Sequence, residues 1–235
     1  MKNSKLILLL TTFSKREIEQ FTLFLASPYY NNQEVFSRLF SILKPMFTSK
    51  AIELTGETIF ESLFPNRKFD AKHLSNYTSR LLTLAQKFLG VEAVTKEKYH
   101  VQALELKELS KRGLSKHFKT TYSKAEKVMK KEKLSLDSYF HKYQLKYIEH
   151  EFRQVNQEKI TQKNLQSIFN DFDSYIILKK ISLASEKIAY ENAYSFSLKS
   201  AFLNDLDKLV QQQPFKETLL IQLYYHAYKM YINME

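Results

Sequence analysis

The stretch that best defines the fold is residues 13–28, which read FSKREIEQFTLFLASP. Ser14 and Glu17 have the spacing of a capping box, in which each side chain accepts a hydrogen bond from a backbone N–H at the start of a helix. Phe13 and Ile18 stand where a hydrophobic staple closes over that first turn. Apolar residues then recur every three or four positions until a Ser-Pro pair ends the pattern. The stretch therefore predicts an amphipathic helix with defined ends.

Similar start and stop signals recur along the rest of the chain. Before residue 91 they predict three more helices: one after Asn32 that stops at Pro45, one after Thr55 that stops at Pro65, and one from Asp70 to Gly90. Beyond that point they predict longer helices over 92–112, 115–133, 136–158, 162–192, 197–211 and 214–233. Gly113 suits the left-handed position that closes a helix.

The spacing of these helices indicates how they pair. Paired helices begin near residues 71, 115, 162 and 214, at intervals of 44, 47 and 52 residues. These intervals lie close to the roughly 40–47 residues of HEAT-like repeats. We therefore expect an all-α fold of consecutive antiparallel helices, an α-solenoid of HEAT/TPR-like helix pairs with no sheet. Residues 1–90 would form an N-terminal bundle of short helices, and residues 91–235 longer hairpins that continue the solenoid.

The composition agrees with this fold class. The 235 residues include only three Gly and four Pro, and no Asn-Gly, Asp-Gly or Gly-Gly pair that would indicate a tight hairpin. Without cysteine the chain has no disulfide framework, thiolate metal site or cysteine nucleophile. The apolar run at residues 6–10 is too short for an export signal, and no stretch is long enough to span a membrane. We expect a cytoplasmic protein.

Motifs for catalysis or cofactors are missing from the sequence. The three glycines do not form a phosphate-binding loop, and no G-x-S-x-G elbow occurs. Glu97 and His100 match half of a di-iron motif, but no second E-x-x-H is present. We therefore expect a protein that is not an enzyme and that uses neither a metal nor another cofactor.

The most pronounced local feature is a basic stretch. Between Lys107 and Lys133 there are ten Lys or Arg residues and three acids, in a chain whose formal net charge is +11. At 100° per residue, six lysines fall on one side of the predicted helix: Lys116, Lys119, Lys124, Lys127, Lys130 and Lys131. The opposite side carries Phe118, Tyr122, Ala125 and Met129. We prefer to interpret the basic side as a solvated face; the alternative is a weak, sequence-indifferent phosphate-binding surface for nucleic acid.

Residues 55–89 suggest a second possible contact with nucleic acid. A short helix, a turn at residues 65–69 and a longer helix resemble a helix-turn-helix, in which Asn76 and Arg80 would reach the bases. The turn is longer than the usual three or four residues, and two packed helices joined by a loop explain the same pattern.

The last predicted helix, 214–233, is apolar around most of its circumference. It includes five residues that we predict to form a protein interface: Tyr224, Tyr225, Tyr228, Tyr231 and Ile232. We expect Phe202, Leu206 and Leu209 of the preceding helix to cover one side. The other side predicts self-association or capture of a helical partner, because tyrosine is enriched at protein interfaces.

Several segments resemble an uncharacterised protein family of Bacteroidetes-type bacteria. They are LTTFSKRE at 10–17, FLASPYYN at 24–31, IFESLFP at 59–65, Phe69-Asp70, and KRGL at 111–114. The resemblance implies an all-helical, tetratricopeptide-like protein and supplies no activity. It also implies that this chain is the N-terminal portion of a longer protein.

These observations favour a non-catalytic helical scaffold that binds other proteins. The alternative is a nucleic-acid-binding or regulatory protein that uses the basic face within residues 107–133. The sequence does not identify the partner.

Overall fold

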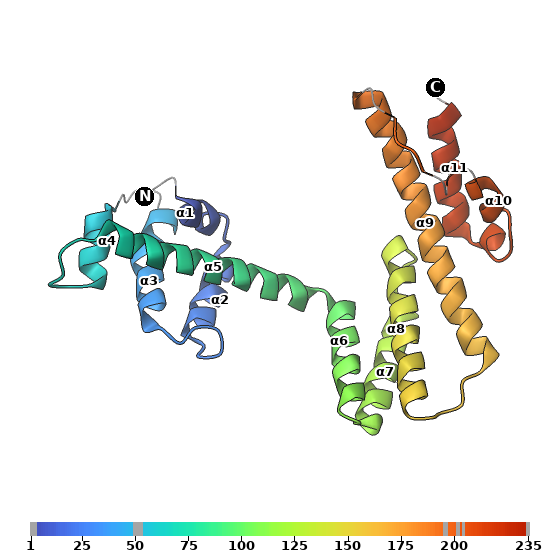
Figure 1. Ribbon diagram of the computed structural model, residues 1–235, viewed down its shortest axis with the longest axis horizontal. Coiled ribbons are helices and arrows are strands. Elements are labelled where there is room, and N and C mark those ends of the chain that lie inside the picture. Colours follow the sequence, from blue (N-terminus) through green and yellow to red (C-terminus); the bar gives the residue numbers. More distant parts are fainter. Residues whose placement is uncertain (1–3, 49–53, 195–196, 201–202, 204, 234–235) are drawn as a thin grey trace. The chain divides into compact units, whose positions relative to one another are not determined.

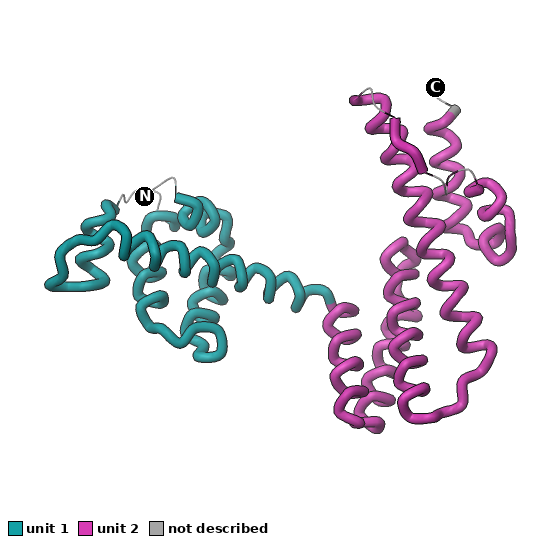
Figure 2. Tube along the Cα trace, viewed as in Figure 1, with its two compact units in different colours: residues 1–97 teal, residues 98–235 magenta. Residues whose placement is uncertain are grey.

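A computed structural model describes residues 4–48, 54–194, 197–200, 203 and 205–233 (Figure 1). Of these residues 79% are helical, and none lies in a β-strand, which confirms the all-α prediction. The chain divides into two compact units, residues 1–97 (unit 1) and residues 98–235 (unit 2), shown in Figure 2. The arrangement of helix pairs as a solenoid stays a prediction.

Unit 1 contains five helices. They are α1 (Lys5–Leu10), α2 (Lys15–Ala26), α3 (Glu34–Thr48), α4 (Gly56–Leu63) and α5 (Ala71–Lys96). The predicted capping box at the start of α2 is present. The Ser14 N–H donates to Glu17 Oε2 at 2.8 Å, and the Glu17 N–H donates to Ser14 Oγ at 3.2 Å. The Ser14 hydrogen bonds hold the pKa of the Glu17 carboxyl below its ordinary value.

Two predicted helix ends in unit 1 are wrong. Pro45 lies inside α3, which continues to Thr48. A proline this close to a helix end removes one backbone hydrogen bond, and the burial of Met46 and Phe47 immediately after it offsets that loss. Gly90 likewise lies inside α5, which continues to Lys96, because a single glycine costs a helix only about 1 kcal/mol.

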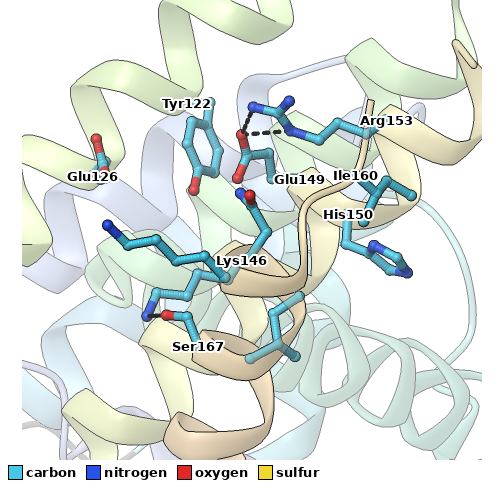
Figure 3. Close-up of a pocket in the computed structure, with 11 residues that line it drawn as sticks. Tyr122, Glu126, Lys146, Glu149, His150, Arg153, Ile160 and Ser167 are labelled. Carbon is cyan, nitrogen blue, oxygen red and sulfur yellow. Dashed lines mark hydrogen bonds and ion pairs between the residues drawn. The ribbon is translucent and has the colours of Figure 1, made fainter. Parts of the chain in front are cut away.

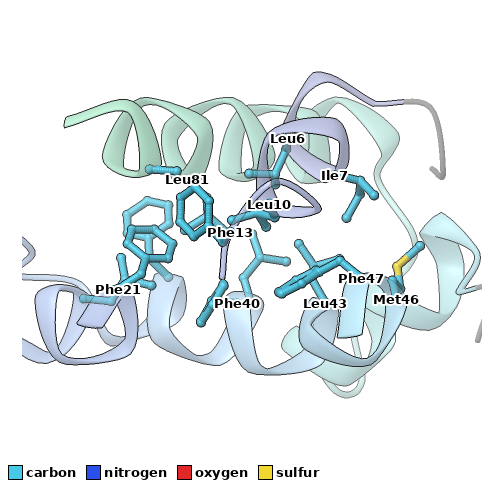
Figure 4. Close-up of a cluster of buried hydrophobic side chains, with 14 of the residues drawn as sticks. Leu6, Ile7, Leu10, Phe13, Phe21, Phe40, Leu43, Met46, Phe47 and Leu81 are labelled. Atoms are coloured by element: carbon cyan, nitrogen blue, oxygen red, sulfur yellow. The ribbon is translucent and has the colours of Figure 1, made fainter. Parts of the chain in front are cut away.

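The helices of unit 1 enclose one apolar core (Figure 4). Its centre is Phe21, whose side chain is fully buried. The Phe21 ring lies 4.9 Å from the Phe40 ring and 5.3 Å from the Phe88 ring, measured between centroids. The three rings come from α2, α3 and α5, so the contacts of Phe21 pack α2 against both other helices.

Unit 2 contains longer helices. They are α6 (Lys98–Lys111), α7 (Ser115–Met129), α8 (Leu136–Val155), α9 (Gln162–Tyr194), the short α10 (Leu206–Val210), the 3-10 helix η2 (Phe215–Glu217) and α11 (Leu219–Asn233). Gly113 has φ +68° and ends α6 as predicted. The Gly113 N–H donates to the Ser110 carbonyl and the Leu114 N–H to the Leu109 carbonyl, which is the hydrogen-bond pattern of a Schellman motif.

Five of the six helices predicted after residue 91 are shorter than expected. The helix predicted over 92–112 begins at Lys98, and the helix predicted to end at 133 ends at Met129, so Lys131 follows it in a turn. Among the described residues of 197–211, the α-helix is α10, and Phe202 lies outside the described residues. The helix predicted from 214 is divided at Thr218, between η2 and α11, and the Phe215 ring is buried there in the core.

Two apolar clusters stabilise unit 2. One joins α6, α7 and α8 and contains Phe118 and Phe152, whose rings stack 3.8 Å apart. The other joins α9, α10, η2 and α11. The 33-residue α9 contains neither Gly nor Pro and packs against both α8 and α11 (Figure 1).

Candidate functional site

The six lysines predicted to share one side of a helix are all exposed in unit 2. The opposite side of α7 is buried as predicted: Phe118, Ala125 and Met129 lie in the α6–α7–α8 cluster. Because these apolar side chains turn inward, the outer side of α7 consists of lysines with Thr120 and Ser123 between them. We call Lys116, Lys119, Lys124, Lys127, Lys130 and Lys131 the lysine face.

Two members of the lysine face are neutralised locally. Lys119 Nζ lies 2.7 Å from Glu158 Oε1, and Lys130 Nζ lies 3.1 Å from Glu126 Oε1. The other four have no acidic partner among the described residues: Lys116, Lys124, Lys127 and Lys131. The lysine face therefore keeps four uncompensated positive charges.

A polar cavity of about 210 Å³ lies between α7, α8 and the start of α9 (Figure 3). Arg153 crosses it and donates to Glu149 Oε1 from Nε at 3.0 Å and from Nη2 at 2.6 Å. Lys146 Nζ lies 2.5 Å from Asp171 Oδ2 and from Ser167 Oγ, so it links α8 to α9. These contacts pair the Arg153 and Lys146 cations with carboxylates, which explains the cavity as a structural junction between helices.

Tyr122 lines that junction and is partly buried in it. Burial, followed by the negative charge of Glu149, raises the pKa of the Tyr122 phenol far above its ordinary value. The phenol therefore stays neutral at physiological pH. Tyr122 lies on the inner side of α7, so the same residue separates the polar cavity from the lysine face.

The five residues predicted as a C-terminal interface do not share one environment. Tyr225 is buried in the α9–α10–α11 cluster, and Tyr224 and Tyr228 are partly buried against it. Tyr231 and Ile232 are exposed. Leu206 and Leu209 cover the inner side of α11, as expected from the sequence. The side of α11 that faces away from this cluster carries other apolar residues, Leu219, Leu223 and Met230, of which Leu219 is 83% exposed.

A hydrogen-bonded triad holds α11 to α10. The Tyr225 hydroxyl donates to Asp207 Oδ1 at 2.9 Å, and Lys229 Nζ donates to Asp207 Oδ2 at 2.7 Å. The hydrogen bond from Lys229 lowers the pKa of the Asp207 carboxyl, and the same bond raises the pKa of Lys229. Burial, together with Asp207, raises the pKa of the Tyr225 phenol. Tyr225 therefore has a structural role in unit 2.

A further exposed apolar surface, on α9, was not predicted from the sequence. Apolar residues recur along the outer side of α9 within an arc of about 60° at 100° per residue. We call them the outer row of α9: Leu165, Phe169, Phe172, Ile176, Leu183, Tyr190 and Tyr194. Phe169 is 61% exposed and Tyr194 is 66% exposed. On α8, Tyr143 extends the row, because its ring lies 4.7 Å from the Phe172 ring.

A sequence signal for this row exists but is easily missed. The residues at 165, 169, 172 and 176 have helical spacing, and the spacing resumes at 183, 190 and 194. On the opposite side of the same helix, Ile177, Leu178 and Ile181 are buried. Because apolar residues line both sides, α9 has no clear amphipathic pattern, and only the packing identifies which side is covered.

The two residues predicted as possible base contacts lie on one helix of unit 1. Asn76 and Arg80 lie on α5, and the Arg80 guanidinium is 5.1 Å from the Phe36 ring of α3. No three His, Asp or Glu side chains in the described part of the chain gather closely enough to hold a metal ion. Among the same residues, no helix has the length and apolar character needed to cross a membrane.

Comparisons of the chain with protein-family models, with curated proteins and with solved structures give no match.

Proposed function

We propose that this chain is a non-catalytic helical protein that binds other proteins through the outer row of α9. The observation that carries the proposal is the exposure of four aromatic rings in one row, on Phe169, Phe172, Tyr190 and Tyr194. Aromatic residues are enriched where proteins bind each other, and extended apolar patches are uncommon on surfaces that contact only water.

The size of the row suits part of a specific interface. An aromatic side chain carries about 200 Å² of surface, so four rings near half exposure present roughly 400 Å². A standard interface takes about 800 Å² from each partner. The row would therefore supply the apolar centre of an interface, and polar neighbours such as Asp173 and Lys187 would form its rim.

A capture experiment from the native cell tests the proposal. The tagged chain should retain protein partners after nuclease treatment, and Phe169→Ser with Tyr190→Ser should reduce their recovery at least tenfold. Lys15→Gln with Lys44→Gln changes two exposed residues of unit 1 and serves as the control, with unchanged recovery expected. Partners that are lost with nuclease, or that are indifferent to the Phe169 and Tyr190 changes, contradict the proposal.

A second candidate function is self-association, in which α11 binds α11 of another copy of the chain. A separate observation favours it. Leu219, Leu223 and Met230 repeat at intervals of four and seven residues, as in the seam of a coiled coil, and each is more than half exposed. Sedimentation at increasing concentration should show a dimer that Leu223→Asp abolishes and Lys216→Asp preserves. A monomer at all concentrations rules out this form.

A further inference from the structure

We propose that the lysine face of α7 binds the phosphate backbone of double-stranded nucleic acid without reading its sequence. This inference is separate from protein binding by α9. It begins from the four lysines that have no acidic partner among the described residues: Lys116, Lys124, Lys127 and Lys131.

The arrangement of these lysines disfavours the isolated helix. Lys127 lies three residues after Lys124 and three residues before Lys130, the C-cap of α7, and like charges at this spacing repel on a helix surface. Lys116 lies in the first turn of α7, where the helix dipole disfavours a cation. A solvated face can carry lysines with alternating acids at no such cost. A polyanion would relieve the repulsion along the whole face.

The chemistry of the face distinguishes among negatively charged partners. Interfaces between proteins have apolar anchors at their centre, where lysine is depleted. The apolar residues Phe118 and Met129 of α7 are buried on its other side, so they are not accessible as anchors for an acidic protein. Single strands bind through exposed aromatic rings, and a membrane surface binds through apolar side chains in the same face. The lysine face offers neither. A row of positive charges without aromatic or apolar anchors matches the phosphate backbone of a duplex.

The dimensions also agree with a duplex. From Lys116 to Lys127 the helix rises about 16 Å at 1.5 Å per residue. A duplex presents one negative charge about every 1.7 Å along its axis, so each lysine has a phosphate within reach. Four contacts predict a slope of about −4 for the logarithm of the binding constant against the logarithm of salt concentration. The absence of arginine from the face predicts equal affinity for different sequences.

Fluorescence anisotropy of the full chain with a labelled 20-base-pair duplex tests this inference. The variant Lys116→Gln, Lys124→Gln, Lys127→Gln, Lys131→Gln should bind at least tenfold more weakly in 50 mM salt and should reduce the salt slope by about 3 to 4. The control variant Lys15→Gln, Lys44→Gln, Lys68→Gln, Lys72→Gln removes the same charge from exposed positions of unit 1. It should keep the native slope. If the first variant loses helicity, Lys124→Gln with Lys127→Gln should halve the slope instead.

Several outcomes overturn the inference. An equal loss of affinity for the duplex in the two four-residue variants would mean that the duplex is attracted by the net charge of the chain alone. Tighter binding to the single strand, or displacement of the duplex by polyglutamate at matched charge, would assign the face to another partner. Loss of protein capture by the Phe169 and Tyr190 changes leaves this inference unaffected, because those residues lie on α9.

Discussion

In unit 1, five helices enclose a single cluster of 21 buried residues, eight of which are Phe. In unit 2, which is longer, the buried residues form two separate clusters of eight and seven. The difference arises from α9 and α11, which carry apolar residues on outer sides that no described segment of unit 2 covers completely. Unit 1 therefore gathers most of its large apolar residues in one core, although Leu23 and Tyr29 are exposed, whereas α9 and α11 of unit 2 leave whole rows of apolar residues exposed.

The largest expected effect is the loss of the central ring of unit 1. Phe21→Ala should reduce the free energy of unfolding of unit 1 by about 4 kcal/mol, because Phe21 is fully buried and contacts the rings of Phe13, Phe40 and Phe88. Hydrogen exchange followed by mass spectrometry would show the loss of protection in residues 5–96. Phe118→Ala is the matched change in unit 2 and should expose residues 98–155 instead. Equal exposure of both units by either variant would contradict the distinction between the two cores.

A smaller effect is expected where α11 is held to α10. Asp207→Asn should destabilise unit 2 by about 1 kcal/mol, since it weakens the partly exposed contacts of Asp207 with Tyr225 and Lys229. The matched control is Asp205→Asn, at a mostly exposed carboxylate 3.7 Å from Lys208, which should have little effect. Thermal unfolding of both variants at neutral pH measures the difference.

The same carboxyl predicts a pH dependence. The pKa of Asp207 is lowered in the folded chain. At a pH between this lowered value and the ordinary Asp pKa, the folded state therefore binds fewer protons than the unfolded state. Its stabilising contribution is therefore present above the ordinary Asp pKa and is lost as the pH falls through the lowered value. Asp207→Asn should remove this part of the acid sensitivity. An unchanged acid transition would show that the triad does not stabilise α11.

The helices themselves depend on sequence signals that act within a few residues. The capping box of α2, the buried side of α7 and the closure of α6 at Gly113 follow from local chemistry, and all three were predictable. Pro45 and Gly90 do not end their helices: the burial of Met46 and Phe47 against other helices offsets the local cost of Pro45, and a single glycine costs a helix only about 1 kcal/mol.

The candidate surfaces were predictable only in part. The lysine face could be derived because every member belongs to one short segment. The ion pair from Lys119 to Glu158 joins residues 39 positions apart, so the number of free charges could not be derived. The outer row of α9 required knowledge of which side packs against α8 and α11. Periodicity identifies sides of a helix, but only tertiary contacts decide which of two apolar sides is covered.

A stabilising change is expected on the lysine face. Lys116→Gln should increase the free energy of unfolding by about 0.5 kcal/mol at low ionic strength, because Lys116 lies in the first turn of α7, where the helix dipole disfavours a cation. The gain should vanish in 1 M salt, where charges are screened within about 3 Å. Lys44→Gln on α3 lies in neither the first nor the last turn of its helix and should give no gain. A loss of stability in Lys116→Gln would show that the lysine stabilises α7.

The smallest effect on stability is expected on the outer row of α9. Phe169→Ser removes the same type of side chain as Phe21→Ala, yet the change in the free energy of unfolding should stay below about 0.5 kcal/mol, because Phe169 is mostly exposed. Chemical denaturation measures both variants under the same conditions. A loss comparable to that of Phe21→Ala would mean that the row is part of the core and not a binding surface.

The length of α9 has a mechanical consequence. Its 33 residues span about 50 Å at 1.5 Å per residue, and no Gly or Pro interrupts them. Such a helix behaves as a stiff lever inside unit 2, with α8 packed along one part and α11 along another. A rotation of about 5° about one end displaces the other end by about 4 Å over that length. If a bound partner tilts α9 where it contacts α8, the other end of the helix moves, and the packing of α9 against α11 changes.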